Sequence, residues 1–273
     1  MSVLYVVGTP IGNLQDFSPR AVETLRSVDF VAAEDTRVTQ KLFNHFEIKK
    51  PMVSYHEHNL RERGEMILSR IQNGESCAVV SDAGMPCISD PGEDLVRLCT
   101  DAGVPVRVIP GPSAAVSALA ISGLPTTRFT FEGFLSTNRK NRLEHLESLK
   151  EEKRTMVFYE APHKLLATLQ DLAAFFGESR RISIVRELTK IYEEARRSTL
   201  GEALLFYQEL KPKGEFVLVV EGMTKQEEPQ PTLDEAVAKA QELIDGGMKA
   251  TEAAKAAAKD SPFSKAEIYR NLL

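Results

Sequence analysis

Residues 79–92 read Val79-Val80-Ser81-Asp82-Ala83-Gly84-Met85-Pro86-Cys87-Ile88-Ser89-Asp90-Pro91-Gly92, an apolar run that ends abruptly in small, polar and turn-forming residues. A helical pattern resumes directly after it, so the stretch predicts a strand, a loop and a helix. Loops at the carboxyl ends of parallel strands are where open α/β sheets bind ligands. The alternative is a loop that only turns the chain, with Asp90 as the N-cap of the helix and Pro91 at its first position.

The same pattern of an apolar strand followed by a polar or glycine-rich loop recurs through the first 124 residues. Strands that alternate with helices form parallel sheets with right-handed crossovers, so we expect a five-stranded parallel sheet whose loops converge on one cleft. The other four strands and their loops are 3–7 before Gly8-Thr9-Pro10-Ile11-Gly12-Asn13-Leu14, 30–33 before Glu34-Asp35-Thr36-Arg37, 52–55 before His56-Glu57-His58-Asn59, and 104–109 before Pro110-Gly111-Pro112-Ser113-Ala114.

Taken one at a time, these loops leave several chemistries open. The Gly8–Gly12 pair has neither the third glycine of a dinucleotide fingerprint nor the Gly-Lys-Ser/Thr of a P-loop. The ionisable run 34–37 either caps the next helix or faces a site. His56 and His58 have no third ligand at suitable spacing, so we expect no metal. Contact with a polar substrate, or a hydrogen-bond network within the loop, is the favoured role for these histidines.

The domain organisation follows from two breaks in the pattern, at 124–127 and at 224–231. We expect an N-terminal α/β domain at 1–124, a second α/β domain with a mixed or parallel sheet at 125–223, a linker at 224–231 and a small helical module at 232–273. The second domain is expected to hold strands at 128–134, 155–159, 182–185 and 216–220, and the module helices at 233–244, 251–258 and 265–272.

Two features of these later regions have both a purely structural and a functional interpretation. The basic run 138–142 opens a helix, where cations oppose the helix dipole, which favours a binding role over a solvated helix start. The helical module is either a nucleic-acid-binding unit or an appendage or dimer contact. Its nearly balanced charge gives the first choice little support.

Composition narrows the class of protein. The chain has 273 residues, of which 42% are hydrophobic and 27% charged, so it can bury a sizeable core. Its net charge of -5 argues against holding bare nucleic acid by bulk electrostatics. The three cysteines lack metal-ligand spacing and are expected to be reduced. No apolar run approaches membrane-spanning length and no basic leader precedes the first strand, so we expect a soluble cytoplasmic protein.

Taken together, the loops quoted above, with Phe158-Tyr159-Glu160 and Arg186-Glu187-Leu188-Thr189-Lys190, closely resemble the ribosomal RNA branch of the tetrapyrrole-methylase-like (class III) methyltransferases. The match spans about residues 3–222, and the helical tail resembles the same branch. The resemblance implies two α/β domains with the cofactor in the cleft between them, and a homodimer. It also implies 2'-O-ribose methylation of a cytidine in the decoding region of 16S ribosomal RNA, with S-adenosylmethionine as the donor.

The resemblance also implies which residues form the site. The positions that match the family are expected to surround the cofactor with backbone carbonyls, carboxylates and small residues. The oxygens suit a cationic sulfonium, and the small residues let the backbone approach the cofactor. The implied cofactor residues are Pro10, Ser81, Asp82, Ala83, Gly84, Ile88, Ser113, Ala114, Tyr159, Leu188, Glu215 and Phe216.

A ribose hydroxyl is a weak acid, so a base or a cation near the developing alkoxide is expected to help methyl transfer. The candidates for these catalytic roles are Asp35, Arg37, Glu187 and Lys190. The candidates for substrate binding are Glu34, His56, His58, Arg139, Lys140, Arg142 and Arg186.

The chain departs from this branch at Ser136-Thr137-Asn138, where proline and a basic residue are usual, and at Lys164, where arginine is common. In this interpretation Arg139, Lys140 and Arg142 replace the missing charge. Two other functions stay open from the sequence: a methylase of a tetrapyrrole or another small molecule, and a non-catalytic RNA-binding or ribosome-assembly factor. The negative charge favours 16S ribosomal RNA within an assembled small subunit over protein-free RNA as the substrate.

Overall fold

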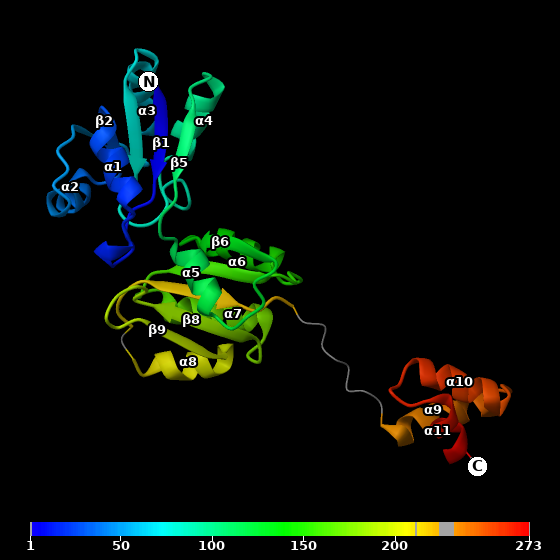
Figure 1. Cartoon of the computed structure of the whole chain (residues 1–273). Coiled ribbons are helices and arrows are strands. Elements are labelled where there is room, and N and C mark those ends of the chain that lie inside the picture. Colours follow the sequence, from blue (N-terminus) through cyan, green and yellow to red (C-terminus); the bar gives the residue numbers. More distant parts are fainter. Residues whose placement is uncertain (1, 211, 224–231, 273) are drawn as a thin grey trace. The chain divides into compact units, whose positions relative to one another are not determined.

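The computed structural model describes residues 2–210, 212–223 and 232–272. The chain forms two compact units, Met1–Met223 and Thr224–Leu273. The first unit contains two five-stranded sheets (Figure 1). The predicted linker at 224–231 lies outside the described residues.

The first sheet is parallel, as the sequence predicts. Its strands are β1 (Val3–Val7), β2 (Phe30–Ala33), β3 (Met52–Ser54), β4 (Ser76–Val80) and β5 (Val106–Ile109), in the order β3-β2-β4-β1-β5. Helices α3 (Leu60–Gln72) and α4 (Glu93–Asp101) cover one face and α1 (Pro19–Ser27) and α2 (Thr36–His45) the other. Alternate residues of β4 therefore enter different cores: Cys77 and Val79 pack with α3 and α4, Ala78 and Val80 with α1 and α2.

The order of the strands creates a crevice beyond the carboxyl ends of β1 and β4. These strands lie side by side at the centre, yet the chain leaves β1 toward β2 and leaves β4 toward β5, on opposite sides. The loops that follow them are joined, because the Thr9 amide donates to the Gly84 carbonyl at 2.8 Å and the Gly84 amide donates back at 3.2 Å. Open α/β sheets bind ligands at such a switch point.

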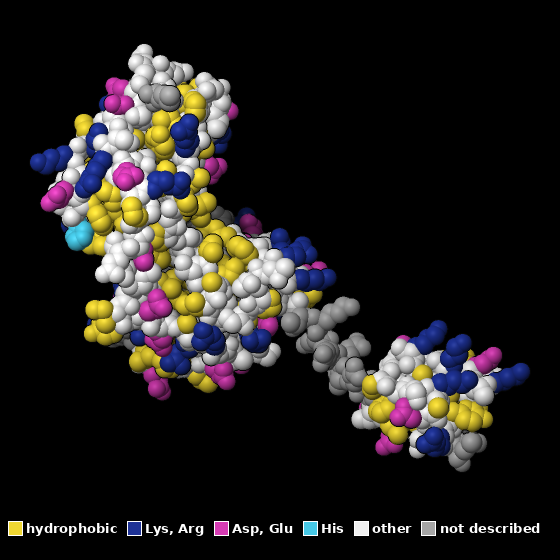
Figure 2. Space-filling model, in the orientation of Figure 1, with side chains coloured by type: hydrophobic (Ala, Val, Ile, Leu, Met, Phe, Trp, Pro, Cys, Tyr) yellow, Lys and Arg dark blue, Asp and Glu magenta, His cyan; other side chains and the backbone are white. Residues whose placement is uncertain are grey.

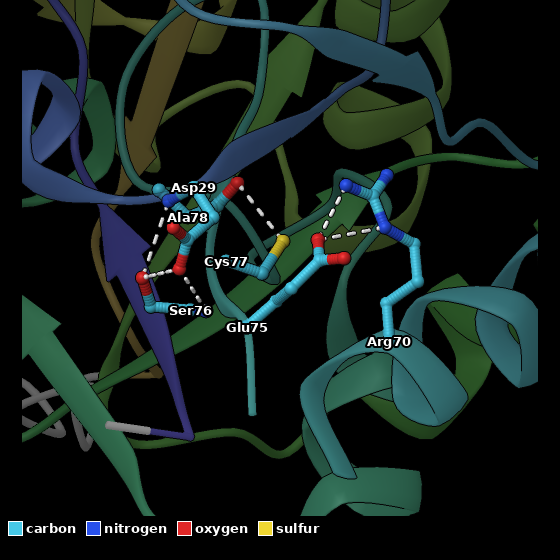
Figure 3. Close-up of polar contacts among 6 residues, drawn as sticks. All are labelled: Asp29, Arg70, Glu75, Ser76, Cys77 and Ala78. Carbon is cyan, nitrogen blue, oxygen red and sulfur yellow. Dashed lines mark hydrogen bonds and ion pairs between the residues drawn. The ribbon is translucent and has the colours of Figure 1, made fainter. Parts of the chain in front are cut away.

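The amino end of β4 is fixed to its neighbours by polar contacts that Figure 3 shows. The Asp29 carboxylate accepts from both the backbone amide and the hydroxyl of Ser76, each at 2.7 Å. On the other side, the guanidinium of Arg70 donates to Glu75 at 2.9 Å and lies over the ring of Phe30, 3.5 Å from its centroid. These contacts fix the position of β4, and with it the loop that β4 delivers to the crevice.

The second sheet is mixed. Its strands are β6 (Phe129–Phe134), β7 (Thr155–Glu160), β8 (Arg181–Arg186), β9 (Glu194–Thr199) and β10 (Phe216–Val220), in the order β6-β7-β10-β8-β9. Only β6 and β7 pair in parallel, and β10 runs antiparallel to both β7 and β8. Helices α6 (Arg139–Ser148), α7 (Leu165–Phe176) and α8 (Leu200–Gln208) pack on one face, and α5 (Ala114–Ile121) packs on the other.

Two details of this sheet differ from the sequence-based expectation. Strand β9 was not predicted, because its sequence Glu-Ala-Arg-Arg-Ser-Thr has almost no apolar residue, as suits an edge strand paired only to β8. Helix α5 was placed in the first domain, but Ala115, Ala118 and Leu119 pack on Val157 and Val217 of the second sheet. We therefore propose a domain boundary at 110–113 rather than at 124.

The second unit contains three helices, at the places the sequence predicts. They are α9 (Leu233–Asp245), α10 (Ala250–Lys259) and α11 (Lys265–Asn271), packed mainly through alanines and Ile268. Capping boxes begin α9 and α11. Of the residues described in either unit, none belongs to a helix long and apolar enough to cross a membrane.

Replacing Asp29 with Ala tests how β4 is fixed. The two hydrogen bonds from Ser76 lower the pKa of the Asp29 carboxyl, so its ionised form stabilises the fold. Because Asp29 is exposed, we expect a loss of about 1 kcal/mol in the free energy of unfolding at pH 7. Denaturant titrations should show this difference shrinking as the pH falls below about 4, since protonation removes the same interaction. A difference that stays constant down to pH 2 would contradict this role.

Candidate active site

A cavity of about 500 Å³ lies between the two sheets of the first unit. The carboxyl ends of β2, β4, β6, β7 and β8 contribute to its lining, together with the start of α5. Because β10 is antiparallel to β7 and β8, it contributes its amino end instead, at 215–217. The volume lies within the range of about 300–1,000 Å³ that is typical of small-molecule sites.

Most of the predicted cofactor residues meet in this cavity. The lining includes Asp82, Ala83, Gly84, Ile88, Ser113, Ala114, Tyr159, Leu188, Glu215 and Phe216. Pro10 and Ser81 are not part of it. Ser81 is buried behind its neighbour Asp82, where its carbonyl accepts from the Thr9 hydroxyl at 3.3 Å. The Ser81 hydroxyl is buried beside Asp90, where its interaction with that carboxyl opposes the rise of the Asp90 pKa.

Other lining residues were not predicted as site residues. They are Ile11, Met85, Asp90, Phe134, Glu160, Ala161, Pro162, His163, Val185 and Val217. The interpretation of Asp90 as a helix cap is wrong, because α4 begins later, with Gly92 as its N-cap and without a side-chain cap. The position of Asp90 in the loop after β4 was a signal that it faces the site, and the cap was the alternative interpretation of the same loop.

Three carboxyl groups give one wall of the cavity an acidic character. The Asp82 amide donates to Glu34 at 3.3 Å, and the Asp35 amide donates to Asp82 at 3.1 Å, so the loops after β2 and β4 hold each other. Burial raises the pKa of Glu34 and of Asp82. Burial, together with the nearby charge of Glu34, raises the pKa of Asp90 to about 6. Acids held together in this way favour a cationic ligand, which would relieve their repulsion.

The opposite wall is aromatic and belongs to the second sheet. The hydroxyl of Tyr159 accepts from the Ala115 amide at 3.2 Å, which ties the start of α5 to β7. The Tyr159 ring packs against Phe131 and Phe134, with centroid separations of 5.0 and 5.4 Å. An apolar wall facing an acidic one suits a molecule with an aromatic part and a cationic part.

Two of the four predicted catalytic residues, Glu187 and Lys190, line the cavity. The Lys190 ammonium lies 3.1 Å from the Glu187 carboxylate. Glycines leave room for both side chains: a Cβ at Gly214 would lie 2.2 Å from Oε1 of Glu187, and one at Gly12 would lie 2.8 Å from Cγ of Lys190. Lys190 from the second sheet therefore rests on the loop after β1 of the first.

The other two predicted catalytic residues, Asp35 and Arg37, lie outside the cavity lining. Asp35 is the N-cap of α2, where it accepts from the Arg37 amide at 2.8 Å, and its carboxylate pairs with the Arg37 guanidinium at 2.6 Å. These bonds hold the pKa of Asp35 well below its usual range, so the carboxylate is a weak base. Arg37, with 87% of its side chain exposed, can still meet a substrate outside the cavity.

The predicted substrate residues are dispersed. Only Glu34 lines the cavity. His56 and His58 lie together in the loop after β3, with ring centroids 5.9 Å apart. Arg139 and Lys140 are exposed at the start of α6, and Arg186 pairs with Glu194 at 2.7 Å.

The prediction that Arg142 binds substrate is wrong. Arg142 is 8% exposed and donates to Asp171 at 2.5 Å and to the Thr168 hydroxyl at 3.2 Å. Thr168 in turn donates to Glu160, whose other carboxylate oxygen accepts from the Ala161 amide at 2.8 Å. Arg142 thus braces the end of β7 from behind, because its position in the first turns of α6 points it toward α7.

Comparison with known proteins places this geometry in a family. A model of the family described as tetrapyrrole (corrin/porphyrin) methylases matches residues 3–204. A relative from Synechocystis sp., named ribosomal RNA small subunit methyltransferase I, is 47% identical over 99% of this chain and 97% of its own length. The chain belongs to this methyltransferase family.

Further relatives carry the same name. The one from Bacillus subtilis is 45% identical over 98% of this chain and 93% of its own length. The one from Thermotoga maritima is 48% identical over 81% of this chain and 99% of its own length. Among solved structures, a uroporphyrin-III-C-methyltransferase from Thermus thermophilus (TM-score 0.58, 19% identical, covering 80% of this chain and 94% of that one) and a diphthine synthase (TM-score 0.60, 16% identical, covering 80% and 89%) share the fold.

The cofactor of the family, S-adenosylmethionine, fits the residues present. The molecule carries an adenine ring, a sulfonium, an ammonium and a carboxylate. The cavity offers an aromatic wall and, opposite it, carboxyl groups whose pKa values are raised. The small side chains of Ala83, Gly84 and Ala114 let a ligand in the cavity come close to the backbone. Within residues 2–210, 212–223 and 232–272, no group of three or more histidines, cysteines or carboxylates is placed to hold a metal ion.

The pH dependence of cofactor binding tests the acidic wall. Since the free Asp90 carboxyl has a pKa raised to about 6 and a cationic ligand favours its ionised form, affinity for S-adenosylmethionine should fall as the pH is lowered from 7.5 to 5. Calorimetry on Asp90→Asn should give a weaker affinity at pH 7.5 and a flatter profile. His163→Gln is the control, because it replaces an imidazole that lines the same cavity. Loss of the dependence in the histidine variant instead would remove Asp90 from this role.

Proposed function

We propose that this protein transfers the methyl group of S-adenosylmethionine to the 2'-hydroxyl of a cytidine in the decoding region of 16S ribosomal RNA. The observation that carries the proposal is the identity of 47% over 99% of the chain to a relative named for methylation of small-subunit ribosomal RNA. The ribose oxygen and the base rest on the resemblance of the loops that form the cavity.

Methyl transfer is an in-line displacement, so its main requirement is alignment. When bound, S-adenosylmethionine supplies an electrophilic methyl carbon: the ribose oxygen forms the new bond, the carbon–sulfur bond breaks, and the hydroxyl proton must leave. Glu187 is our candidate to receive that proton, and the Lys190 ammonium beside it is our candidate to stabilise the developing negative charge. The acidic wall formed by Glu34, Asp82 and Asp90 would hold the cationic end of the cofactor.

Residues 1–223 are proposed to carry the whole reaction. The relative from Thermotoga maritima aligns over 99% of its own length to 222 residues of this chain, which is close to the size of the first unit. The helical unit therefore lies beyond the part shared with that relative, although the relatives from Synechocystis sp. and Bacillus subtilis align over 99% and 98% of this chain. We propose that the protein works as a homodimer in the cytoplasm, without a membrane or a metal.

An assembled small subunit is the proposed form of the substrate. The chain has a net charge of -5, and on the face of the first unit shown in Figure 2 basic side chains are interspersed with acidic ones. Binding to bare RNA through its phosphates alone would need a larger excess of positive charge. A ribosomal particle that presents the target nucleotide in one conformation can be bound with a smaller excess of positive charge.

The main alternative is methylation of a tetrapyrrole or another small molecule. The description of the matching family model and the fold shared with a uroporphyrin-III-C-methyltransferase favour it. The same fold hosts different substrates, so the fold does not decide between them. A direct assay of the product does.

The deciding assay is transfer of labelled methyl from S-adenosylmethionine to small ribosomal subunits that lack the modification, followed by mapping of the labelled nucleotide. A single 2'-O-methylcytidine in the decoding region is expected. Label in the RNA at another position would refute the target, and absence of label despite measurable cofactor binding would refute RNA methylation. Equal transfer to protein-free 16S RNA would refute the preference for an assembled particle.

Lys190→Ala separates chemistry from cofactor binding. If the ammonium stabilises the developing alkoxide, turnover on small subunits should fall by about 100-fold. The dissociation constant for S-adenosylmethionine should change little. Lys150→Ala, at an exposed lysine that pairs with Glu147, is the matched control and should keep normal turnover. An equal loss of cofactor affinity and turnover in Lys190→Ala would assign the lysine a structural role.

A further inference from the structure

The loop at 187–193, which joins β8 to β9, carries two adjacent exposed apolar side chains at its tip. Ile191 is 95% exposed and Tyr192 is 78% exposed, the highest values for any large hydrophobic residue among those described. Large apolar side chains that stay exposed at the edge of a candidate site need an explanation, because their burial is favourable.

Strand pairing at both ends of the loop and hydrogen bonds within it hold the tip in its exposed position. The β8–β9 ladder continues up to the pair Arg186 and Glu194, so the loop starts and ends at fixed points. Inside it, the Lys190 amide donates to the Glu187 carbonyl at 3.0 Å, and the Glu193 amide donates to the Lys190 carbonyl at 3.1 Å. The Glu193 carboxylate accepts from the Thr189 amide at 2.7 Å. These bonds tie together the residues on either side of Ile191 and Tyr192.

The backbone of the loop stores strain as well. Glu187 and Thr189 have φ values of 53° and 65°, in the left-handed region that residues with a side chain rarely adopt. Such conformations cost free energy and persist where the surroundings impose them, often at ligand sites. With this backbone conformation, Glu187, Leu188 and Lys190 line the cavity. Ile191 and Tyr192, which follow them, face solvent.

This arrangement places the apolar tip at the rim of the cavity. Tyr192 follows Lys190 by two residues, so their Cα atoms lie within about 7.6 Å of each other. That span is comparable to one nucleotide step along an RNA strand. Lys190 also rests on Gly12 of the opposite sheet, so the loop reaches across the cavity from one sheet to the other. A ribose that approaches Lys190 therefore brings its own base, or the neighbouring one, next to Tyr192.

We infer that Tyr192, with Ile191 beside it, is a stacking platform for a nucleobase of the RNA substrate at or next to the methylated nucleotide. Specific RNA recognition depends on unstacked bases that lie on aromatic side chains, and such stacking does not need a positive charge. The charged groups of the loop are already paired, Lys190 with Glu187 and Glu193 with a backbone amide, so its tip is suited to the face of a base rather than to a phosphate. Tyr192 is thus a positioning residue, and this inference rests on the proposed function.

Three variants test it on small subunits that lack the modification. Tyr192→Ala should raise KM for the subunits roughly ten- to hundredfold, as expected for loss of one stacked base, with a smaller effect on kcat. Tyr192→Phe keeps the ring and should restore KM to within about threefold. Leu205→Ala removes a side chain that is 70% exposed on α8, away from the cavity lining, and should change nothing. The dissociation constant for S-adenosylmethionine should be the same in all three.

The other possible occupants of the tip give different results. If Tyr192 contacts a second copy of the chain, Tyr192→Ala changes the oligomeric state in sedimentation, which would overturn the inference. An unchanged KM in Tyr192→Ala, or failure of Tyr192→Phe to restore it, would also overturn it. Filter binding of the variants to small subunits separates the stacking proposal from the proposed function. If the wild type binds the subunits but does not methylate them, the function is refuted. The binding of Tyr192→Ala then still tests whether Tyr192 stacks on a base. A wild type that does neither refutes both.

Discussion

The joining of the loops after β1 and β4 is the constraint on which the site depends. Thr9 and Gly84 exchange backbone hydrogen bonds at 2.8 and 3.2 Å, at the point where the strand order of the first sheet reverses. A third loop closes on the same point, since a Cβ at Gly8 would lie 2.7 Å from Cα of Gly111. Three strand ends are thus held so close that only glycine fits between them. From there the chain enters α5, which crosses to the second sheet.

The second sheet completes the site because β10, which runs antiparallel to its neighbours, directs its amino end toward the cavity. Strand β10 presents 215–217 beside the carboxyl ends of β7 and β8, and Gly214 makes room for Glu187. The buried network from Arg142 through Thr168 to Glu160 fixes the end of β7 from the far side. The cavity is therefore acidic on one wall and aromatic on the other, with the Glu187–Lys190 pair at its edge. We propose that the acidic wall holds the cationic methyl donor and that the RNA approaches at the edge formed by Glu187 and Lys190.

The sequence predicts the parts of this structure that depend on apolar periodicity and on loops at strand ends. All five strands of the first sheet follow from their apolar runs, and most of the residues predicted to bind the cofactor line the cavity. Strand β9 was not predicted, because hydrogen bonding to β8 and not burial creates it. The substrate-binding role predicted for Arg142 is wrong, as is the alternative interpretation of Asp90 as a helix cap, for a related reason: which way a side chain points from a helix start or a turn depends on tertiary packing. The sequence does not decide which sheet helix α5 belongs to, because its small residues fit either one, and its packing on the second sheet is the basis of the boundary that we propose.

The central claim is that loops from both sheets bind one S-adenosylmethionine. Hydrogen–deuterium exchange of the full chain, with and without the cofactor, tests it most directly. The account predicts slower exchange in 82–90 and 113–115 and, in the same experiment, in 187–190 and 215–217, while the helices of the second unit exchange as before. Protection confined to the loops of one sheet, or located outside the cavity, would contradict the account.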